Sequence, residues 1–427
     1  MTTALPTPPA GAPSAPTSSA PAPHAAPARP PRLDSVDLLR GLVMVIMVLD
    51  HTRDFAFAGT LHFGATDLTQ TTPAIFFTRW ITHFCAPIFV FLAGTGIMLQ
   101  RLRGKPLPEL SRFLVTRGLW LIVLEFTAVR IGWLWNLDYD RFIGMAQVIW
   151  AIGWGMIIMA ALIRLPVAAV FTLGLAITFL HDLLTPFFGP FMTPPGAPAP
   201  TLGADLFMIL FSRGVINLGH PTPVIFFGYA VIPWLGAMAL GYGVGVVYGW
   251  TPAARQRALL WAGSLTTLAF VVVRAINHYG DPAPWSTQPT AVFTLLSFLN
   301  VNKYPPSLDY LLMTLGPAML ALVWFERLRP NALSQVFVTF GRVPFFFYLL
   351  QWPFAHGLAL IAGLVAHKPV DYLSTSLFSG TSAPPNAGVS LPATYALWIA
   401  AIVLLYPLCR WFSNLKRTHT WWWLSYI

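Results

Sequence analysis

The sequence predicts an all-α fold, a polytopic bundle of about ten transmembrane helices. Hydrophobic residues make up 56% of the 427 residues and charged residues only 9%, a balance that soluble domains of this length do not have. Apolar runs long enough to cross a bilayer recur along most of the chain, and many of the loops between them are short. These observations favour a multi-pass membrane protein over a soluble enzyme.

Three regions differ in composition. Residues 1–31 are rich in Pro, Ala, Ser and Thr and nearly free of charge, so they cannot bury an apolar core and we expect a disordered tail. Residues 32–412 hold the apolar runs and form the predicted membrane domain. Residues 413–427 are basic and then aromatic, which is typical of a tail at the cytoplasmic surface of a membrane.

The apolar runs define the predicted spans, because a helix needs about 20 apolar residues to cross the hydrocarbon core. The segment 202–210 is apolar but shorter, which favours an interfacial or re-entrant piece. The predicted spans are residues 37–55, 74–100, 113–133, 143–163, 166–184, 224–249, 258–276, 308–325, 338–362 and 391–409.

Basic residues predict the orientation. They gather in alternate loops, whereas the longer loops between hold few, so both termini are expected in the cytoplasm. Arg40 then lies near the inner end of the first span and His51 at its outer end. The net charge of +10 is spread over many loops, so we expect membrane lipids rather than nucleic acid as partners. The inner-side residues are Arg101, Arg103, Lys105, Arg112, Arg164, Arg255, Arg257, Arg327 and Arg329.

The first span carries a charged stripe. Arg40 and His51 are eleven positions apart, which places them on nearly the same helix face and roughly 16 Å apart along the axis. Asp37 and Asp54 fall on that face as well. An ionisable residue inside a membrane span is a functional candidate by default. His51 has a simpler interpretation as well, an interfacial histidine that caps the helix C-terminus.

Two histidines are candidates for catalysis. Asp50 next to His51 could orient the imidazole and raise its basicity, as a general base needs. In the second span, Arg79 and His83 are one turn apart and share a face. His83 is either a second catalytic histidine, a substrate ligand, or a buried histidine that bonds a neighbouring helix.

The segment before the eighth span is a further candidate. Lys303 and Tyr304 are followed by two prolines, which exclude a helix there, and Ser307 is a suitable N-cap for the helix that follows. Lys303 and Tyr304 would lie at the outer mouth of the bundle. The alternative is a rigid turn with a lysine that extends to the membrane surface.

Metal and nucleotide motifs are absent from the sequence. The two cysteines, Cys85 and Cys409, are far apart and give no metal-ligand spacing, so no metal is expected. No zinc-protease, Walker or nucleophile-elbow motif occurs. Chemistry carried by histidine alone stays open.

Several segments resemble one family. Residues 32–54, which run Arg-Leu-Asp-Ser-Val-Asp-Leu-Leu-Arg-Gly and end Asp-His-Thr-Arg-Asp, resemble the opening of bacterial membrane proteins with the heparan-α-glucosaminide N-acetyltransferase catalytic domain. The Pro-x-Phe-Val-Phe-Leu-Ala-Gly run at 87–94 is similar to the family's second helix. The resemblance continues through Asn302-Lys-Tyr-Pro-Pro-Ser-Leu, Met313-Thr-Leu-Gly-Pro and Gly341-Arg-Val-Pro-Phe, and covers about residues 32–412.

The resemblance implies a transmembrane acyltransferase. In that superfamily an acetyl group passes from cytoplasmic acetyl-CoA, or another acyl-CoA, to an acceptor on the far side of the membrane, such as a sugar amine or hydroxyl. Acyl-CoA is then a co-substrate and no cofactor is bound. The implied location is a cell membrane, in a bacterium the inner one.

This hypothesis assigns roles to the candidate residues. His51, Asp50 and His83 form the predicted catalytic group. Asp54, Arg79, Lys303 and Tyr304 are predicted to bind the acceptor. Arg342 near the inner end of the ninth span is either a donor ligand or only an orienting charge. The predicted donor-binding residues are Arg40, Arg101, Arg103, Lys105 and Arg342.

Two other function classes stay open. The charged stripe would also suit a transporter or exporter that moves protons or substrate along it. A non-catalytic membrane protein of the same fold is the third alternative. The sequence leaves open which glycan or small molecule accepts the acyl group, and a homodimer is among the assemblies it allows.

Overall fold

A computed structural model of the chain describes residues 1–4, 34–190, 192, 200–218, 223–375, 383–419 and 421–427. The chain divides into two units, Met1–Arg32 and Leu33–Ile427. The predicted disordered tail, residues 1–31, falls almost entirely outside the described residues. All the elements below belong to the second unit.

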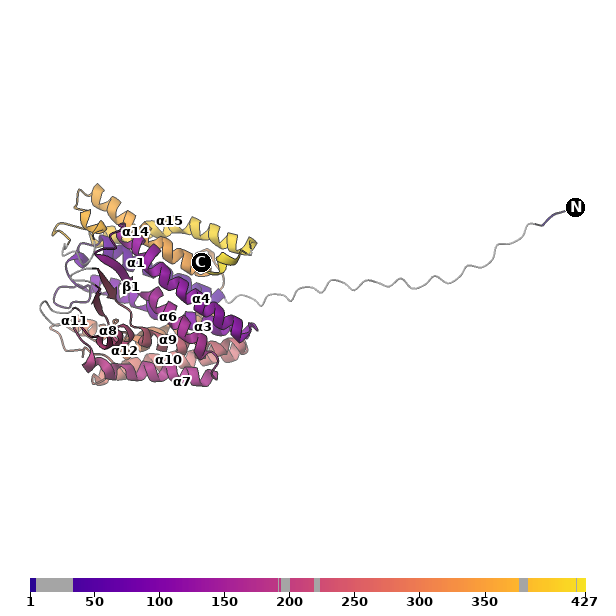
Figure 1. The fold of residues 1–427 in the computed structure, drawn as a ribbon, viewed down its shortest axis with the longest axis horizontal. Helices are drawn as coiled ribbons and strands as arrows, with labels where there is room; N and C mark the ends of the chain where they lie inside the picture. Colours follow the sequence, from indigo (N-terminus) through magenta and orange to yellow (C-terminus); the bar gives the residue numbers. More distant parts are fainter. Residues whose placement is uncertain (5–33, 191, 193–199, 219–222, 376–382, 420) are drawn as a thin grey trace. The chain divides into compact units, whose positions relative to one another are not determined.

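The second unit is a bundle of long helices that run alongside one another (Figure 1), so the predicted all-α architecture is confirmed. The first half holds α1 (Asp34–Ala56), α2 (Pro73–Trp80), α3 (Cys85–Leu102), α4 (Leu107–Leu124), α5 (Arg130–Leu134), α6 (Val148–Leu162), α7 (Val167–Leu180) and α8 (Leu202–Phe211). The second half holds α9 (Val231–Val244), α10 (Pro252–Ile276), α11 (Ala291–Leu299), α12 (Leu308–Arg327), α13 (Ala332–Arg342), α14 (Pro344–Val365) and α15 (Leu391–Thr418).

One small sheet joins the bundle. Its strands are β1 (Phe142–Ala146), β2 (Gly214–Asn217) and β3 (Val224–Phe227), in the order β1-β3-β2. β1 pairs parallel to β3, and β2 pairs antiparallel to it. The predicted spans 143–163 and 224–249 were therefore wrong at their starts, which are strands. Short apolar runs do not distinguish a buried strand from a helix by periodicity.

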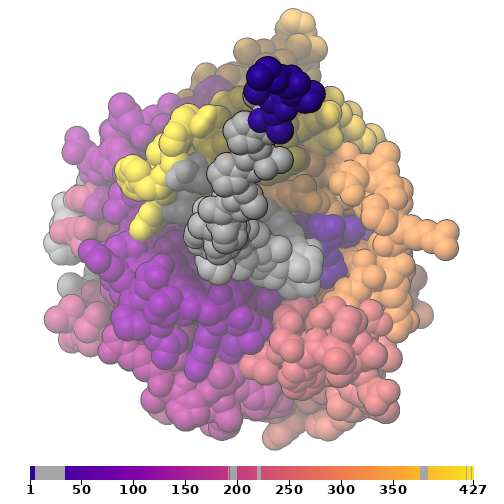
Figure 2. Space-filling model, turned by 90° about the vertical axis from the view of Figure 1, so that its right-hand side faces the viewer, coloured from indigo at the N-terminus to yellow at the C-terminus, as the bar shows by residue number. Residues whose placement is uncertain are grey.

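The two ends of the bundle differ. The sheet and the described parts of the long loops lie at the left end in Figure 1, which is where α1 ends. Figure 2 shows the opposite end, where the purple residues around the α3–α4 turn, the salmon residues around the start of α10 and the yellow C-terminal residues come to the surface. The long loops predicted to face outward thus share one end of the unit.

Within the described residues, seven helical segments are long and apolar enough to cross a membrane. They are Pro73–Leu102, Val167–Phe187, Val231–Gly249, Pro252–Ile276, Leu308–Arg327, Pro344–Val365 and Leu391–Thr418. The other predicted spans fall on α1, which is charged, on α6, which has 15 residues, and on α4, which continues through a π-helical turn, Glu125–Val129, into α5. The predicted span 338–362 was wrong as a single helix, because the chain breaks at Val343 and restarts with Pro344 at the first helical position.

Helix α1 is the centre of the bundle. It packs against α3, α12, α13, α14 and α15. Its charged residues Asp37, Asp50 and Arg53 are all buried. Of the charged stripe, Asp37 is buried and Arg40, His51 and Asp54 are half-buried, so the polar side of α1 is largely covered by protein, as an ionisable residue in an apolar bundle requires.

Glycines permit the closest helix contacts. A Cβ on Gly94 of α3 would overlap the backbone carbonyl of Met238 in α9, and a Cβ on Gly241 of α9 would overlap that of Phe91. Gly41 of α1 and the backbone of Phe337 in α13 form a similar contact. These small residues let the helix backbones touch, as is common for helices that associate in membranes.

We expect Gly94→Ala to lower the free energy of unfolding by about 1–3 kcal/mol, because the added methyl overpacks the α3–α9 contact. Gly96, on the same helix, is the matched control, since a Cβ there meets nothing within 4 Å. Thermal melting of both variants in detergent measures the difference. Equal melting temperatures for the two alanine variants would contradict the predicted contact.

Candidate functional site

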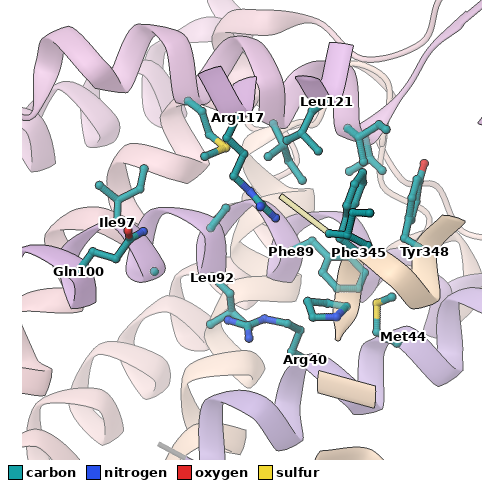
Figure 3. A pocket seen from close by; sticks show the side chains of 18 of the residues that line it. Arg40, Met44, Phe89, Leu92, Ile97, Gln100, Arg117, Leu121, Phe345 and Tyr348 are labelled. Atoms are coloured by element: carbon teal, nitrogen blue, oxygen red, sulfur yellow. The ribbon is translucent and has the colours of Figure 1, made fainter. Parts of the chain in front are cut away.

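Two cavities lie at opposite ends of α1. The first, which we call the Arg40 cavity, has a volume of about 380 Å³ and lies between α1, α3, α4, α6 and α14 (Figure 3). Most of its wall is apolar and comes from side chains such as Phe89, Leu92 and Phe345. Three cations, Arg40, Arg117 and Lys416, also line it. It is therefore a mostly apolar cavity with positively charged residues in its wall.

Arg40 and Arg117 approach this cavity from different helices. Figure 3 shows Arg117 reaching down from α4 into the space above Arg40. The Arg40 guanidinium donates to Asp37 Oδ1 at 3.1 Å and to the carbonyl oxygen of Gly341 at 3.2 Å. These bonds tie the side chain to α1 and α13 while it still borders the cavity.

The second cavity, which we call the Asp54 cavity, has a volume of about 680 Å³ and a far more polar wall. It receives side chains from the end of α1, from α2, from the sheet and from the loop before α12. Its charged and titratable residues are Asp50, His51, Arg53, Asp54, Arg79, His83, Arg213, Lys303 and Tyr304. All four predicted acceptor-binding residues and all three predicted catalytic residues thus line one cavity.

The carboxylate of Asp50 holds α1 and α2 together. Arg79 Nη1 donates to both of its oxygens, at 2.7 and 2.6 Å, and Thr82 Oγ1 donates to Oδ1 at 2.8 Å. Arg53 Nη2 lies 2.7 Å from Oδ1 and also donates to Asp54 at 2.6 Å. Asp50 was predicted to orient the His51 imidazole. In the structure the Asp50 carboxylate instead faces the two arginines.

His51 sits among aromatic rings. Its ring centroid lies 3.8 Å from that of Trp352 and 6.0 Å from that of Trp133. Within the described part of the chain, its Nδ1 is buried without a hydrogen-bond partner. The imidazole borders the Asp54 cavity, so it is available to a molecule bound there.

A small third cavity shares wall residues with both larger cavities, and we call it the constriction. Its volume is about 30 Å³. Its wall shares Asp50, His51 and Lys303 with the Asp54 cavity. It shares Phe89, Val148 and Tyr348 with the Arg40 cavity. The three spaces therefore follow one another along α1, and His51 lines both the constriction and the Asp54 cavity.

Buried hydrogen bonds fix the loop that carries Lys303 and Tyr304. Asp281 accepts from the Asn302 N–H and from Ser307 Oγ, each at 2.7 Å. Ser307 Oγ accepts from the Tyr310 N–H at 3.1 Å, so the predicted N-cap of α12 is confirmed. Lys303 is only 8% exposed, and its ammonium lies 5.1 Å from the Tyr304 ring centroid.

Two tyrosines at this cavity have shifted pKa values. Burial raises the pKa of the Tyr304 phenol, but the positive charges of Lys303 and Arg79 outweigh it and hold that pKa below its ordinary value. Burial raises the pKa of Tyr229, and the neighbouring tyrosines Tyr304 and Tyr310 add to the effect. The positive charge at this cavity thus favours an anion beside Lys303.

The remaining predicted residues are spread more widely. His83 is buried at the Asp54 cavity, with Nδ1 lacking a partner among the described residues and its backbone carbonyl accepting from the Tyr310 hydroxyl. Arg101 donates to the Tyr242 hydroxyl, and Arg342 pairs with Asp34 at 3.4 Å. Arg103 is exposed. None of these three arginines lines the described cavities, and neither does Lys105, although its ammonium lies over Phe113, which lines the Arg40 cavity.

The family of the chain follows from a match in sequence. The family model described as heparan-alpha-glucosaminide N-acetyltransferase, catalytic, matches residues 32–280, more than half of the chain. The chain belongs to this family. A search among curated proteins finds no matching relative. The matched part of this acetyltransferase family member includes α1 to α10, and Lys303, Tyr348 and Trp352 lie beyond it.

Sequence reasoning missed several residues of the site. Arg117 sits within an apolar predicted span, and an ionisable residue there is the same signal that singled out α1. Arg53 was not among the predicted site residues, although it is adjacent to Asp54 in the sequence. Lys416 and Trp352 carried no local signal, because only the packing of α14 and α15 against α1 brings them to the cavities.

Asp50→Asn should destabilise the protein by about 3–5 kcal/mol, because it leaves half-buried Arg79 without its carboxylate and buried Arg53 with only Asp54. Asp54→Asn is the control, since Arg53 then keeps Asp50. The melting temperatures of the two purified variants give the comparison. A larger loss for Asp54→Asn than for Asp50→Asn would show that the network is assigned to the wrong carboxylate.

Proposed function

We propose that the protein is a membrane acyltransferase that takes an acyl group from acyl-CoA in the Arg40 cavity and passes it to an acceptor in the Asp54 cavity. One observation carries this proposal: the constriction shares wall residues with both cavities, and His51 borders the constriction and the larger cavity together. Membership in the acetyltransferase family supports an acyl group as the cargo.

The Arg40 cavity suits an acyl-CoA donor. Arginine forks bind phosphate oxygens in pairs, and lysine adds a point charge, so Arg40, Arg117 and Lys416 match the charged end of CoA. The apolar wall beyond them suits the long pantetheine arm. The positive loops at this end support its placement in the cytoplasm, where acyl-CoA is found.

The Asp54 cavity suits a polar acceptor. Its wall offers carboxylates, cations and amide groups, such as Asp54, Arg79 and Gln147, which can hold several hydroxyl or amine groups at once. A sugar amine or hydroxyl fits this chemistry. With the cytoplasm at the Arg40 end, the acceptor would reach the cavity from the outer side of a cell membrane.

His51 is the proposed general base. The free imidazole nitrogen takes the proton from the acceptor amine or hydroxyl while its nitrogen or oxygen attacks the thioester carbonyl carbon. The carbon–sulfur bond breaks, and the CoA thiolate takes up the proton that His51 holds. Acyl-CoA and the acceptor thus become the acylated acceptor and free CoA, and His51 returns to its neutral form.

A transporter is the second candidate, because cavities at both ends of one central helix are what a substrate path requires. The small volume of the constriction, about 30 Å³, favours transfer of an acyl group over passage of a whole substrate. Flux of a sugar into vesicles without any acyl donor would favour the transporter.

His51→Gln is expected to reduce acyl transfer by at least about 100-fold, because the glutamine side chain cannot take a proton. The release of CoA thiol from acetyl-CoA in the presence of glucosamine measures turnover. Calorimetric titration with acetyl-CoA should give an unchanged Kd, which controls for folding. Full turnover by the folded variant would remove His51 from the mechanism.

Arg117→Met and Lys416→Met should each weaken acetyl-CoA binding about tenfold or more, because each removes a charge-assisted contact to phosphate. Arg103→Met is the matched control, since Arg103 is exposed and lines neither cavity. The Kd values come from calorimetry on detergent-solubilised protein. A larger increase in Kd for Arg103→Met would indicate that the phosphate site lies at the α3–α4 turn instead.

A further inference from the structure

The constriction is lined by polar atoms that have no partner. Among the described residues, Tyr348 Oη, Trp352 Nε1 and His51 Nδ1 are buried without a hydrogen bond. Tyr348 is 5% exposed and Trp352 is fully buried. A buried donor without an acceptor lowers stability, so such groups in a functional cavity indicate a ligand that accepts from them.

Helix α14 brings two of these donors to one place. Tyr348 and Trp352 are one turn apart and share a helix face. Their ring centroids lie 6.0 Å apart with planes at 88°. Trp352 in turn lies against His51. The order from the Arg40 cavity toward the Asp54 cavity is therefore Tyr348, Trp352, His51.

We propose that Tyr348 and Trp352 form the oxyanion hole of this acyltransferase, with the tyrosine O–H and the indole N–H donating to the thioester carbonyl oxygen. The inference rests on the proposed acyl transfer. When the acceptor attacks the carbonyl carbon, the carbon–oxygen π electrons move to this oxygen, and both donors stabilise the negative charge. Collapse restores the carbonyl and expels the CoA thiolate, which takes the proton from His51.

Position, and not only the lack of a partner, distinguishes these two residues. Tyr248 Oη and Trp234 Nε1 are also buried without a partner, and Gln351 next to Trp352 has an unpaired amide. None of these three residues lines the described cavities. Tyr348 alone borders both the Arg40 cavity and the constriction with a hydroxyl group. Tyr248 and Trp234 therefore supply matched controls.

The experiment compares Tyr348→Phe with Tyr248→Phe, and Trp352→Phe with Trp234→Phe. We expect Tyr348→Phe and Trp352→Phe each to lower kcat about 100-fold, with the Kd for acetyl-CoA changed less than about threefold, because the donors act mainly on the transition state. The two control variants should keep the kcat of the unmodified protein. The double variant Tyr348→Phe/Trp352→Phe should lose less than the product of the single losses, because both donors serve one oxygen.

An infrared measurement separates this role from packing. Bound acetyl-CoA labelled with ¹³C at the thioester carbonyl should absorb at a lower frequency than in water, and Tyr348→Phe should move the band back upward. Tyr248→Phe should leave it in place. Packing alone would not move this band.

Two results would overturn the oxyanion hole while leaving acyl transfer intact: equal kcat for Tyr348→Phe and Tyr248→Phe, or an unchanged carbonyl band in Tyr348→Phe. A loss confined to Kd would also overturn it. If the unmodified protein releases no CoA with amine or hydroxyl acceptors, the proposed function fails instead, and the oxyanion hole with it.

Discussion

The site depends on the ion pairs of Asp50. A helix with as many charges as α1 can lie in the centre of an apolar bundle only if its charges are compensated there, because burying an isolated ion costs several kcal/mol. Asp50 meets Arg53 on its own helix and Arg79 on α2, so one carboxylate joins two helices, and Asp54 supplies the second negative charge beside Arg53. His51 and His83 take their places at the Asp54 cavity from the helices that this carboxylate connects.

The sequence predicted the stripe and the residues around the larger cavity well. The period of α1 placed Asp37, Arg40, His51 and Asp54 on one side; in the structure Asp37 is buried and the other three are half-buried at the cavities. The partner of Asp50 could not be predicted, because residues that are adjacent in the sequence of a helix do not face the same neighbour. Neighbouring residues of a helix point about 100° apart, so Asp50 faces α2 while His51 faces the tryptophans.

The cations of the Arg40 cavity show that periodicity and charge clusters do not predict which distant segments of the chain meet. Arg101, Arg103 and Lys105 form the most prominent basic cluster, yet short contacts with their own surroundings occupy Arg101 and Lys105. Arg117 and Lys416 are three hundred positions apart and meet only because α4 and α15 flank the same space. Likewise Asp281, which fixes the loop of Lys303, acts from more than twenty residues away.

A membrane that contains this protein has to remain an electrical insulator, although a cavity lies toward each end of α1. The constriction has room for about one water molecule, and large rings of α14 surround it. Trp352 is fully buried, and its ring fills space in the wall of the constriction. In the proposed acyl transfer, the contact between Trp352 and His51 would serve twice, by holding the reacting groups and by separating the two cavities against a proton leak.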